Sequence, residues 1–208
     1  MISILNKIRF RLIRAHSLKK TKSTPDFDKE AIYLTFDDGP EPGITEFVLD
    51  ELKKYGVKGT FFCKGENCIK FPELFKRIIE EGHAVANHTY SHINGLETPC
   101  KDYIENVEKC ELSTKSHIFR PPWGKLTLKQ YFKLSKEYKV VLWNIASGDT
   151  DLSNFDLEKS LLSLQSNTRK GSVVLFHFCN LHEKETKQIL PEYLKFLAEN
   201  KYKTQKIH

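Results

Sequence analysis

The chain has 208 residues, a net charge of +6 and 39% hydrophobic residues. This length allows one domain with a full core and is short for two, and the composition argues against wholesale disorder. The 33 lysine and arginine residues are spread along the chain, which favours a solvated surface over a dedicated nucleic-acid interface. We therefore expect no nucleic-acid partner.

The cysteine count of five is odd, and no two cysteines have the CxxC spacing: Cys63, Cys68, Cys100, Cys110 and Cys179. This pattern argues against a disulfide framework or a zinc knuckle. It favours free thiols in a reducing compartment.

Residues 1–30 are expected to form a basic arm or helix before the main domain. The stretch MISILNKIRFRLIRAHSLKK has no apolar run typical of a signal peptide and is too charged to span a bilayer. Its interleaved apolar and basic residues suit peripheral membrane contact through residues 1–20, with a packing helix or frayed arm as the alternative. The expected location is cytoplasmic or at the inner membrane.

From residue 31 onward, short apolar segments alternate with segments of helical spacing. Strands are expected at 31–36, 59–62, 84–87, 117–120, 140–146, 172–178 and 202–207. Helices are expected near 44–55, 71–79, 100–113, 127–137, 156–168 and 185–199. Repeated alternation predicts one α/β domain with parallel strands, as either an open doubly wound sheet or a closed or distorted barrel.

Ionisable residues follow the ends of five expected strands. They are Asp37 and Asp38, His88 and His92, Arg120, Asp149 and Asp151, and His177. The carboxyl ends of parallel strands meet at one edge of the sheet, where α/β proteins collect their chemistry. The sequence therefore predicts a site at this edge.

The motif HTYSH places His88 and His92 four residues apart. In a helical turn the two rings would point the same way and could bind one metal ion, although this spacing also arises by chance. Two histidines and a carboxylate from the first strand would form a catalytic metal site with an open position for water.

LTFDDGP, residues 34–40, ends the first strand in two adjacent carboxylates, Asp37 and Asp38. One of them could bind the metal while the other acts as a general base, and the residues alone do not decide which. We expect Gly39 and Pro40 to supply the turn that directs both side chains to one cavity. A simple turn or cap is the alternative reading.

His177 and Arg120 complete the candidate site. His177 lies in an apolar strand, where it is either a satisfied core histidine or a general acid kept protonated by Asp149. Arg120 precedes two prolines and could pair with the free acid, or it forms an ordinary surface ion pair.

In this order, the motifs resemble the polysaccharide deacetylase family of carbohydrate esterases. The matching stretches are TFDDGP (35–40), NHTYSH (87–92), RPPWG (120–124), SGD (147–149) and LFH (175–177), and the resemblance covers about 31–207. It implies a catalytic domain at 31–208. The fold it implies is a distorted, incomplete (β/α) barrel of about seven parallel strands.

The resemblance also implies the activity, which is the metal-dependent removal of N-acetyl groups from a sugar. Removal of O-acetyl groups is the less favoured alternative. Peptidoglycan, chitin-like oligomers and surface or lipid-linked glycans are the implied substrates. The implied cofactor is Zn²⁺, with Co²⁺ and Ni²⁺ as alternatives. Its ligands match Asp38, His88 and His92.

The remaining roles carried over from the family concern proton transfer and substrate binding. Asp37 matches the base, Arg120 the arginine that tethers it, His177 the general acid and Asp149 the acid that tunes it. The backbone N–H of Trp123 matches the oxyanion donor, and Pro121 and Leu175 match substrate-binding positions.

Two positions depart from the family pattern. Thr150 stands where tryptophan is common, so one wall of the acetyl pocket is lost or comes from elsewhere, and Phe178 stands where aspartate is frequent. Neither change removes a reacting group. A non-catalytic glycan-binding protein on the same scaffold is the rival hypothesis, and the intact set of mechanistic residues argues against it.

Overall fold

The structure, a computed structural model, describes residues 27–208. The membrane contact predicted for residues 1–20, and most of the basic arm predicted for 1–30, lie outside the described residues. Among the described residues, no helix is long and apolar enough to cross a membrane. All five cysteines lie in this part of the chain and are free thiols, as predicted.

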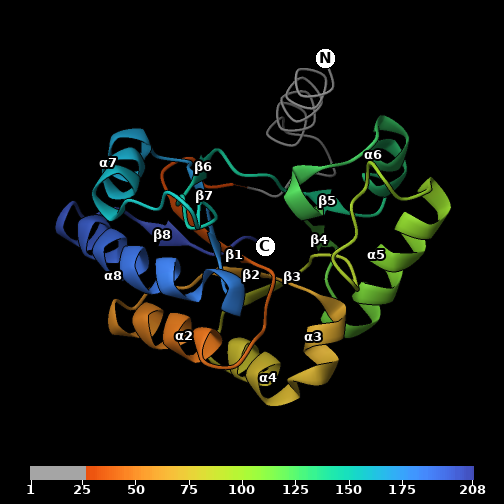
Figure 1. Ribbon diagram of the computed structural model, residues 1–208, viewed down its shortest axis with the longest axis horizontal. Coiled ribbons are helices and arrows are strands. Elements are labelled where there is room, and N and C mark those ends of the chain that lie inside the picture. Colours follow the sequence, from red (N-terminus) through yellow and green to blue (C-terminus); the bar gives the residue numbers. More distant parts are fainter. Residues whose placement is uncertain (1–26) are drawn as a thin grey trace.

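A curled, open sheet of parallel strands forms the centre of the molecule (Figure 1). The strand order is β5 (Lys139–Val140), β4 (Ile118–Phe119), β3 (Ala84–Asn87), β2 (Thr60–Cys63), β1 (Ile32–Asp37), β7 (Val173–His177) and β6 (Ile145–Ala146). A further strand, β8 (Thr204–Gln205), pairs with the start of β1. The predicted parallel α/β domain with an incomplete barrel is confirmed.

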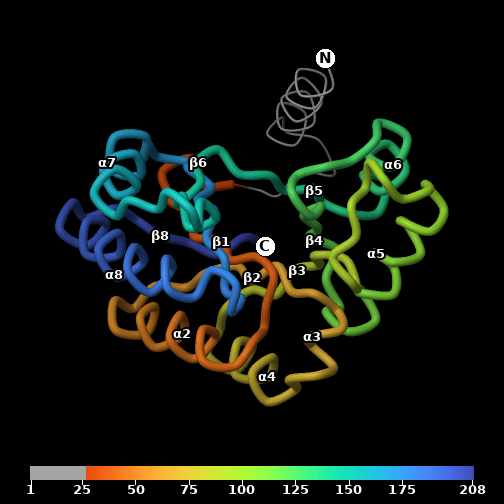
Figure 2. Tube along the Cα trace, in the orientation of Figure 1, coloured from red at the N-terminus to blue at the C-terminus, as the bar shows by residue number. Residues whose placement is uncertain are grey.

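Helices surround the sheet on its outer side (Figure 2). They are α2 (Ile44–Lys54), α3 (Gly65–Lys70), α4 (Pro72–Glu80), α5 (Cys100–Thr114), α6 (Leu128–Leu134), α7 (Leu157–Asn167) and α8 (Glu183–Glu199). Two 3-10 turns, η1 (Pro122–Gly124) and η2 (Asn180–His182), follow β4 and β7. The short helix α3 was not predicted, and α6 is shorter than the predicted 127–137.

The prediction of one strand over 140–146 is wrong. Its first part, in β5, pairs with β4 at one edge of the sheet, and its last part, in β6, pairs with β7 at the other. Residues 141–144 therefore cross the open side of the half-barrel. Val141 and Leu142 are buried there, so the segment is apolar like a strand, and an apolar run does not reveal which partners it has.

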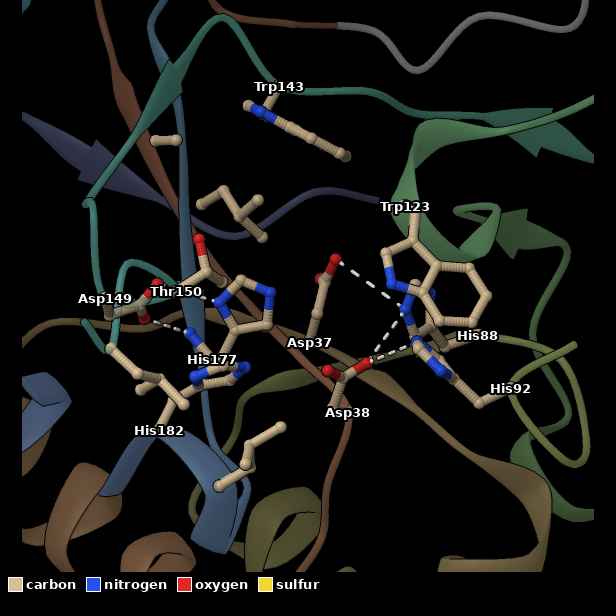
Figure 3. A pocket seen from close by; sticks show the side chains of 14 residues that line it. Asp37, Asp38, His88, His92, Trp123, Trp143, Asp149, Thr150, His177 and His182 are labelled. Atoms are coloured by element: carbon tan, nitrogen blue, oxygen red, sulfur yellow. Dashed lines mark hydrogen bonds and ion pairs between the residues drawn. The ribbon is translucent and has the colours of Figure 1, made fainter. Parts of the chain in front are cut away.

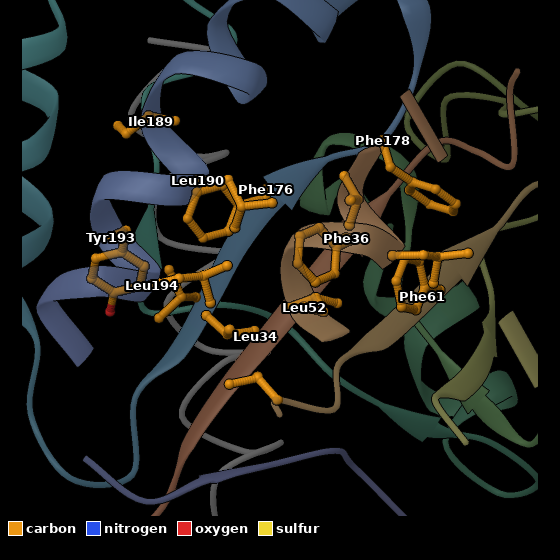
Figure 4. Close-up of a cluster of buried hydrophobic side chains, with 14 of the residues drawn as sticks. Leu34, Phe36, Leu52, Phe61, Phe176, Phe178, Ile189, Leu190, Tyr193 and Leu194 are labelled. Carbon is orange, nitrogen blue, oxygen red and sulfur yellow. The ribbon is translucent and has the colours of Figure 1, made fainter. Parts of the chain in front are cut away.

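Strand β1 is buried along its whole length, and its two faces serve different purposes. On the outer face, Phe36 stacks against Phe61 and Phe176 with ring centres 4.9 and 5.8 Å apart (Figure 4). Side chains alternate along a strand, so Thr35 and Asp37 face the interior of the half-barrel. There both contact Arg120. The hydrophobic core thus fixes the strand whose end carries the acid pair.

Candidate active site

A pocket of about 510 Å³ lies at the carboxyl edge of the sheet, as predicted (Figure 3). Its walls include eight of the predicted site residues: Asp37, Asp38, His88, His92, Trp123, Asp149, Leu175 and His177. Arg120 is fully buried behind Asp37. Pro121 is also buried, and neither it nor Arg120 is part of the pocket wall.

Both acids reach the pocket because the chain reverses at Asp38 itself. Asp37 is the last residue of β1, and Asp38 has a φ of +84°, in the left-handed region that non-glycine residues rarely adopt. The predicted turn at Gly39 and Pro40 thus begins one residue earlier. Gly39 is needed for another reason: a Cβ there would lie 2.4 Å from the ring of Phe178.

Arg120 holds Asp37 in one orientation. Its Nη1 donates to Asp37 Oδ1 at 2.7 Å and to Thr35 Oγ1 at 2.8 Å, and its Nε donates to the Val141 carbonyl at 3.1 Å. The guanidinium carbon also lies 4.0 Å from the centre of the Phe62 ring. Burial lowers the pKa of Arg120, and the charge of Asp37 opposes that shift. The predicted pairing of Arg120 with one of the two acids is present.

Asp38, His88 and His92 converge on one point of the pocket (Figure 3). Asp38 Oδ1 lies 3.2 Å from His88 Nε2 and 2.9 Å from His92 Nε2. Burial raises the pKa of Asp38, but its contacts with His88 and His92 outweigh burial and hold the pKa well below its usual range. The carboxyl group is therefore an anion at neutral pH.

The two histidines are presented by an irregular loop and not by the helical turn that would align their rings. Residues 88–94 have no helical assignment, and Thr89 and His92 have φ values of +65° and +53°. Asn106 in α5 fixes the loop, since its Oδ1 accepts from the backbone N–H of Tyr90 at 2.8 Å. The histidines nevertheless share one face, as the metal hypothesis requires.

These three side chains fit a metal ion. His88 Nδ1 lies 2.8 Å from the Arg120 carbonyl, so Nδ1 carries a proton and Nε2 is the nitrogen available to a metal ion. Asp38 Oδ1 is buried and faces the Nε2 atoms of both histidines. Donor atoms around a tetrahedral zinc ion lie about 3.3 Å apart, given bond lengths of about 2.0–2.1 Å. The two oxygen-to-nitrogen separations, 3.2 and 2.9 Å, are near this value, and all three donor atoms lie within 4.8 Å of one another.

His177 and Asp149 form the opposite wall. His177 Nδ1 lies 2.9 Å from Asp149 Oδ1, and the backbone N–H of His177 donates to Asp149 Oδ2 at 2.7 Å. Burial lowers the pKa of His177, but the charge and hydrogen bond of Asp149 outweigh it and raise the pKa to about 9. His177 is therefore a cation at neutral pH, and the core-histidine alternative does not describe it.

Trp123 forms part of the rim. It has a φ of +53° within η1, its side chain is 52% exposed, and its ring centre lies 4.3 Å from that of His92. An exposed indole beside a polar pocket offers a flat apolar surface with one hydrogen-bond donor. This arrangement suits contact with a sugar ring.

Sequence reasoning missed several residues of the site, of which three are polar or aromatic. Trp143 and His182 line the pocket, and Thr186 Oγ1 donates to Asp149 Oδ2 at 3.1 Å. Trp143 lies in the segment that crosses the open side of the barrel, so its apolar neighbours resembled an ordinary strand. It supplies an aromatic wall in a pocket where Thr150 replaces the expected tryptophan. His182 had one sequence signal, its spacing of three residues from Cys179.

The profile of the family described as Polysaccharide deacetylase matches residues 24–142. A Bacillus cereus protein named Peptidoglycan-N-acetylglucosamine deacetylase is 34% identical over 158 residues, covering 73% of this chain and 57% of that protein. The Bacillus subtilis Peptidoglycan-N-acetylmuramic acid deacetylase PdaA is 35% identical over 161 residues, covering 72% and 60%. The match thus spans less than two thirds of either relative.

A solved structure agrees with these similarities. The crystal structure of a peptidoglycan N-acetylglucosamine deacetylase in complex with 4-naphthalen-1-yl-N-oxidanyl-benzamide superposes with a TM-score of 0.80 and 29% identity, over 88% of each chain. Because the family profile matches more than half of the residues, this chain belongs to the polysaccharide deacetylase family.

Proposed function

We propose that this protein is a metal-dependent hydrolase that removes N-acetyl groups from peptidoglycan sugars. The observation that carries the proposal is that two candidate proton-transfer groups lie side by side on neighbouring strands. Asp37 and His177 are register partners on β1 and β7, and both line the pocket that contains Asp38, His88 and His92. The names of both relatives and of the solved structure support peptidoglycan as the substrate class.

Asp38, His88 and His92 would hold the ion. Two imidazoles and one carboxylate with an open coordination position are typical of catalytic zinc. When bound, a divalent ion supplies Lewis-acid activation of water and of the acetyl carbonyl group. The hydroxamate-type ligand of the solved structure has two oxygen atoms suited to chelation. A hydroxamate is therefore a useful probe of this site.

The chain's own residues divide the proton transfers. Asp37, fixed by Arg120, accepts a proton from the attacking water as general base. The backbone N–H of Trp123 donates to the developing oxyanion, a contribution of about 3–4 kcal/mol at comparable sites. His177, charged through Asp149, then gives its proton to the leaving nitrogen. Leu175 and Trp143 form the apolar wall for the acetyl methyl group.

Acetate release from defined glycans tests this proposal. The zinc-loaded chain is incubated with N-acetylated peptidoglycan fragments and, in parallel, with chitin oligomers and O-acetylated sugars. Mass spectrometry then locates each lost acetyl group. We expect N-deacetylation of the peptidoglycan fragments. Glycan binding without acetate release would instead identify a non-catalytic binding protein, and release only from O-acetylated sugars would overturn the assigned bond.

A further inference from the structure

The four residues after Phe178 present a second pair of metal-binding side chains. Cys179 precedes the 3-10 turn η2, and His182 ends it. Side chains three residues apart in a 3-10 helix eclipse one another, and the backbone N–H of His182 donates to the Cys179 carbonyl at 3.1 Å. The thiol and the imidazole therefore lie on the same side of the turn. Both residues are nearly fully buried, at 5% and 7% exposure.

This pair meets the carboxyl group of Asp38. One oxygen of Asp38, Sγ of Cys179 and one ring nitrogen of His182 all lie within 4.8 Å of one another. Ligand atoms around a tetrahedral zinc ion lie about 3.3–3.6 Å apart, given bonds of about 2.0 Å to nitrogen or oxygen and 2.3 Å to sulfur. We propose that Asp38, Cys179 and His182 form a second divalent-cation site, suited to Zn²⁺. The site goes beyond the proposed deacetylase function and does not depend on it.

His182 supplies an independent indication of a missing ligand. Its Nδ1 is buried and has no hydrogen-bond partner among the described residues. Buried polar atoms of proteins are nearly always satisfied by a partner, water or an ion. His182 thus has an unpaired ring nitrogen and lies beside a thiol and a carboxylate, a donor set that a zinc ion can complete.

The surrounding charge also favours a cation. Glu41 lies beside the turn and accepts a hydrogen bond from the Asn180 N–H at 2.7 Å. Burial raises the pKa of the Cys179 thiol, and the negative charges of Asp38 and Glu41 raise it further. Lys64 is the opposing charge, 3.3 Å from Glu41 Oε1. Binding would replace the thiol proton with a sulfur–metal bond and release that proton to solvent.

Asp38 would serve both sites through its two oxygens. Its Oδ1 contacts His88 and His92, while the other oxygen is turned toward the His182 side of the pocket (Figure 3). The His182 ring lies 4.9 Å from that of His177. If the proposed function holds, a second cation there would repel protonated His177 and block the pocket. Excess zinc would then inhibit the enzyme.

Cobalt binding tests the second site directly, with the full chain titrated with Co²⁺. We expect two ions per chain and a sulfur-to-cobalt charge-transfer band in the near ultraviolet, because the first site contains no thiolate. Cys179→Ser should abolish the band and weaken the second ion more than about tenfold, since even changes beyond the ligands cost about 10–100-fold. Cys100→Ser, a half-buried cysteine in α5, is the matched control.

Two further variants separate this proposal from the first site. His182→Gln should weaken the second ion as Cys179→Ser does, and melting temperatures report whether each variant is folded. The double variant His88→Ala/His92→Ala should lose the first ion and keep the charge-transfer band. One ion per chain at saturation, or two ions without a thiolate band, would overturn the second site and leave the proposed function standing.

Discussion

His88 and His177 each lie against a carboxylate in the same pocket, yet their rings present different atoms to it. His88 directs Nδ1 to the Arg120 carbonyl and Nε2 to Asp38. His177 directs Nδ1 to Asp149, whose other oxygen is already bound by the His177 backbone N–H. We call His88, His92 and Asp38 the ligand half of the site. We call His177 and Asp149 the acid half.

We infer from this comparison that the partner of Nδ1 suits each histidine to its proposed role. A backbone carbonyl accepts a hydrogen bond but carries no full charge, so Nδ1 of His88 donates to it and Nε2 is left to face Asp38. A buried carboxylate stabilises the imidazolium, so the pKa of His177 rises to about 9 despite burial. The same two residue types would thus serve as the proposed metal ligand just after β3 and as the proposed proton donor at the end of β7.

The largest effect should come from Asp37, which lies between the two halves. Asp37→Asn keeps the shape and the contact with Arg120 but cannot accept a proton. We expect turnover to fall by about 10³-fold or more, within the range of general-base catalysis, while metal content stays unchanged. Acetate release and metal analysis on one preparation check this. Wild-type turnover in this variant would show that Asp37 is not the base.

Breaking the ligand half should remove the metal without changing the acid half. His92→Ala removes one of the three proposed ligands, so the variant should lose the stabilisation that the metal provides. This stabilisation is about 2.7 kcal/mol when the free metal concentration is 100 times the dissociation constant. Thermal unfolding with and without one equivalent of Zn²⁺ measures this loss. His117→Ala, at an exposed side chain, is the control. An unchanged metal-dependent shift would exclude His92 as a ligand.

Breaking the acid half should move a pH limit. Asp149→Asn removes the negative charge that raises the pKa of His177. Burial, which lowers this pKa, remains. The alkaline limit of activity should therefore fall from near pH 9 by about two units or more, within the range of shifts caused by burial and charge. A pH–rate profile of kcat measures this shift, and bound metal should be unchanged.

The interaction between His177 and Asp149 also makes the stability of the fold depend on pH in a defined direction. The folded-state pKa of His177, about 9, exceeds its ordinary value of 6.5. The stabilisation is therefore complete below about pH 6.5 and is lost as pH rises through about 9. In Asp149→Asn, the free energy of unfolding should depend less on pH across this window. Identical pH dependence in the variant and the wild type would refute the pairing.

Much of this molecule could be predicted from sequence because its signals are local. Strand–helix alternation predicted the parallel sheet, and residues at strand ends predicted both halves of the site. Left-handed backbone at Asp38 and His92 could not be predicted, because neither residue type requires it and the surrounding packing imposes it. Trp143 was missed because its segment pairs with two distant strands. His182 was missed because only the fold brings it to Asp38.

The smallest expected effect concerns the support of the acid half. Thr186 Oγ1 lies 3.1 Å from both Asp149 Oδ2 and the His177 carbonyl. Thr186→Val removes this buried hydrogen bond with little change of shape and should cost about 1 kcal/mol. For a chain of this size, that corresponds to a melting temperature lower by about 2–4 °C.

Thr168→Val is the matched control for Thr186→Val. Thr168 is also a buried threonine, but its hydroxyl group is hydrogen-bonded to the Leu164 carbonyl and to Tyr193 and not to the acid half. Both variants should lose similar stability, and only Thr186→Val should lower kcat, because only Thr186 touches the carboxylate that charges His177. Equal kcat in the two variants would mean that Asp149 needs no support beyond His177 itself, and the acid half would then consist of those two residues alone.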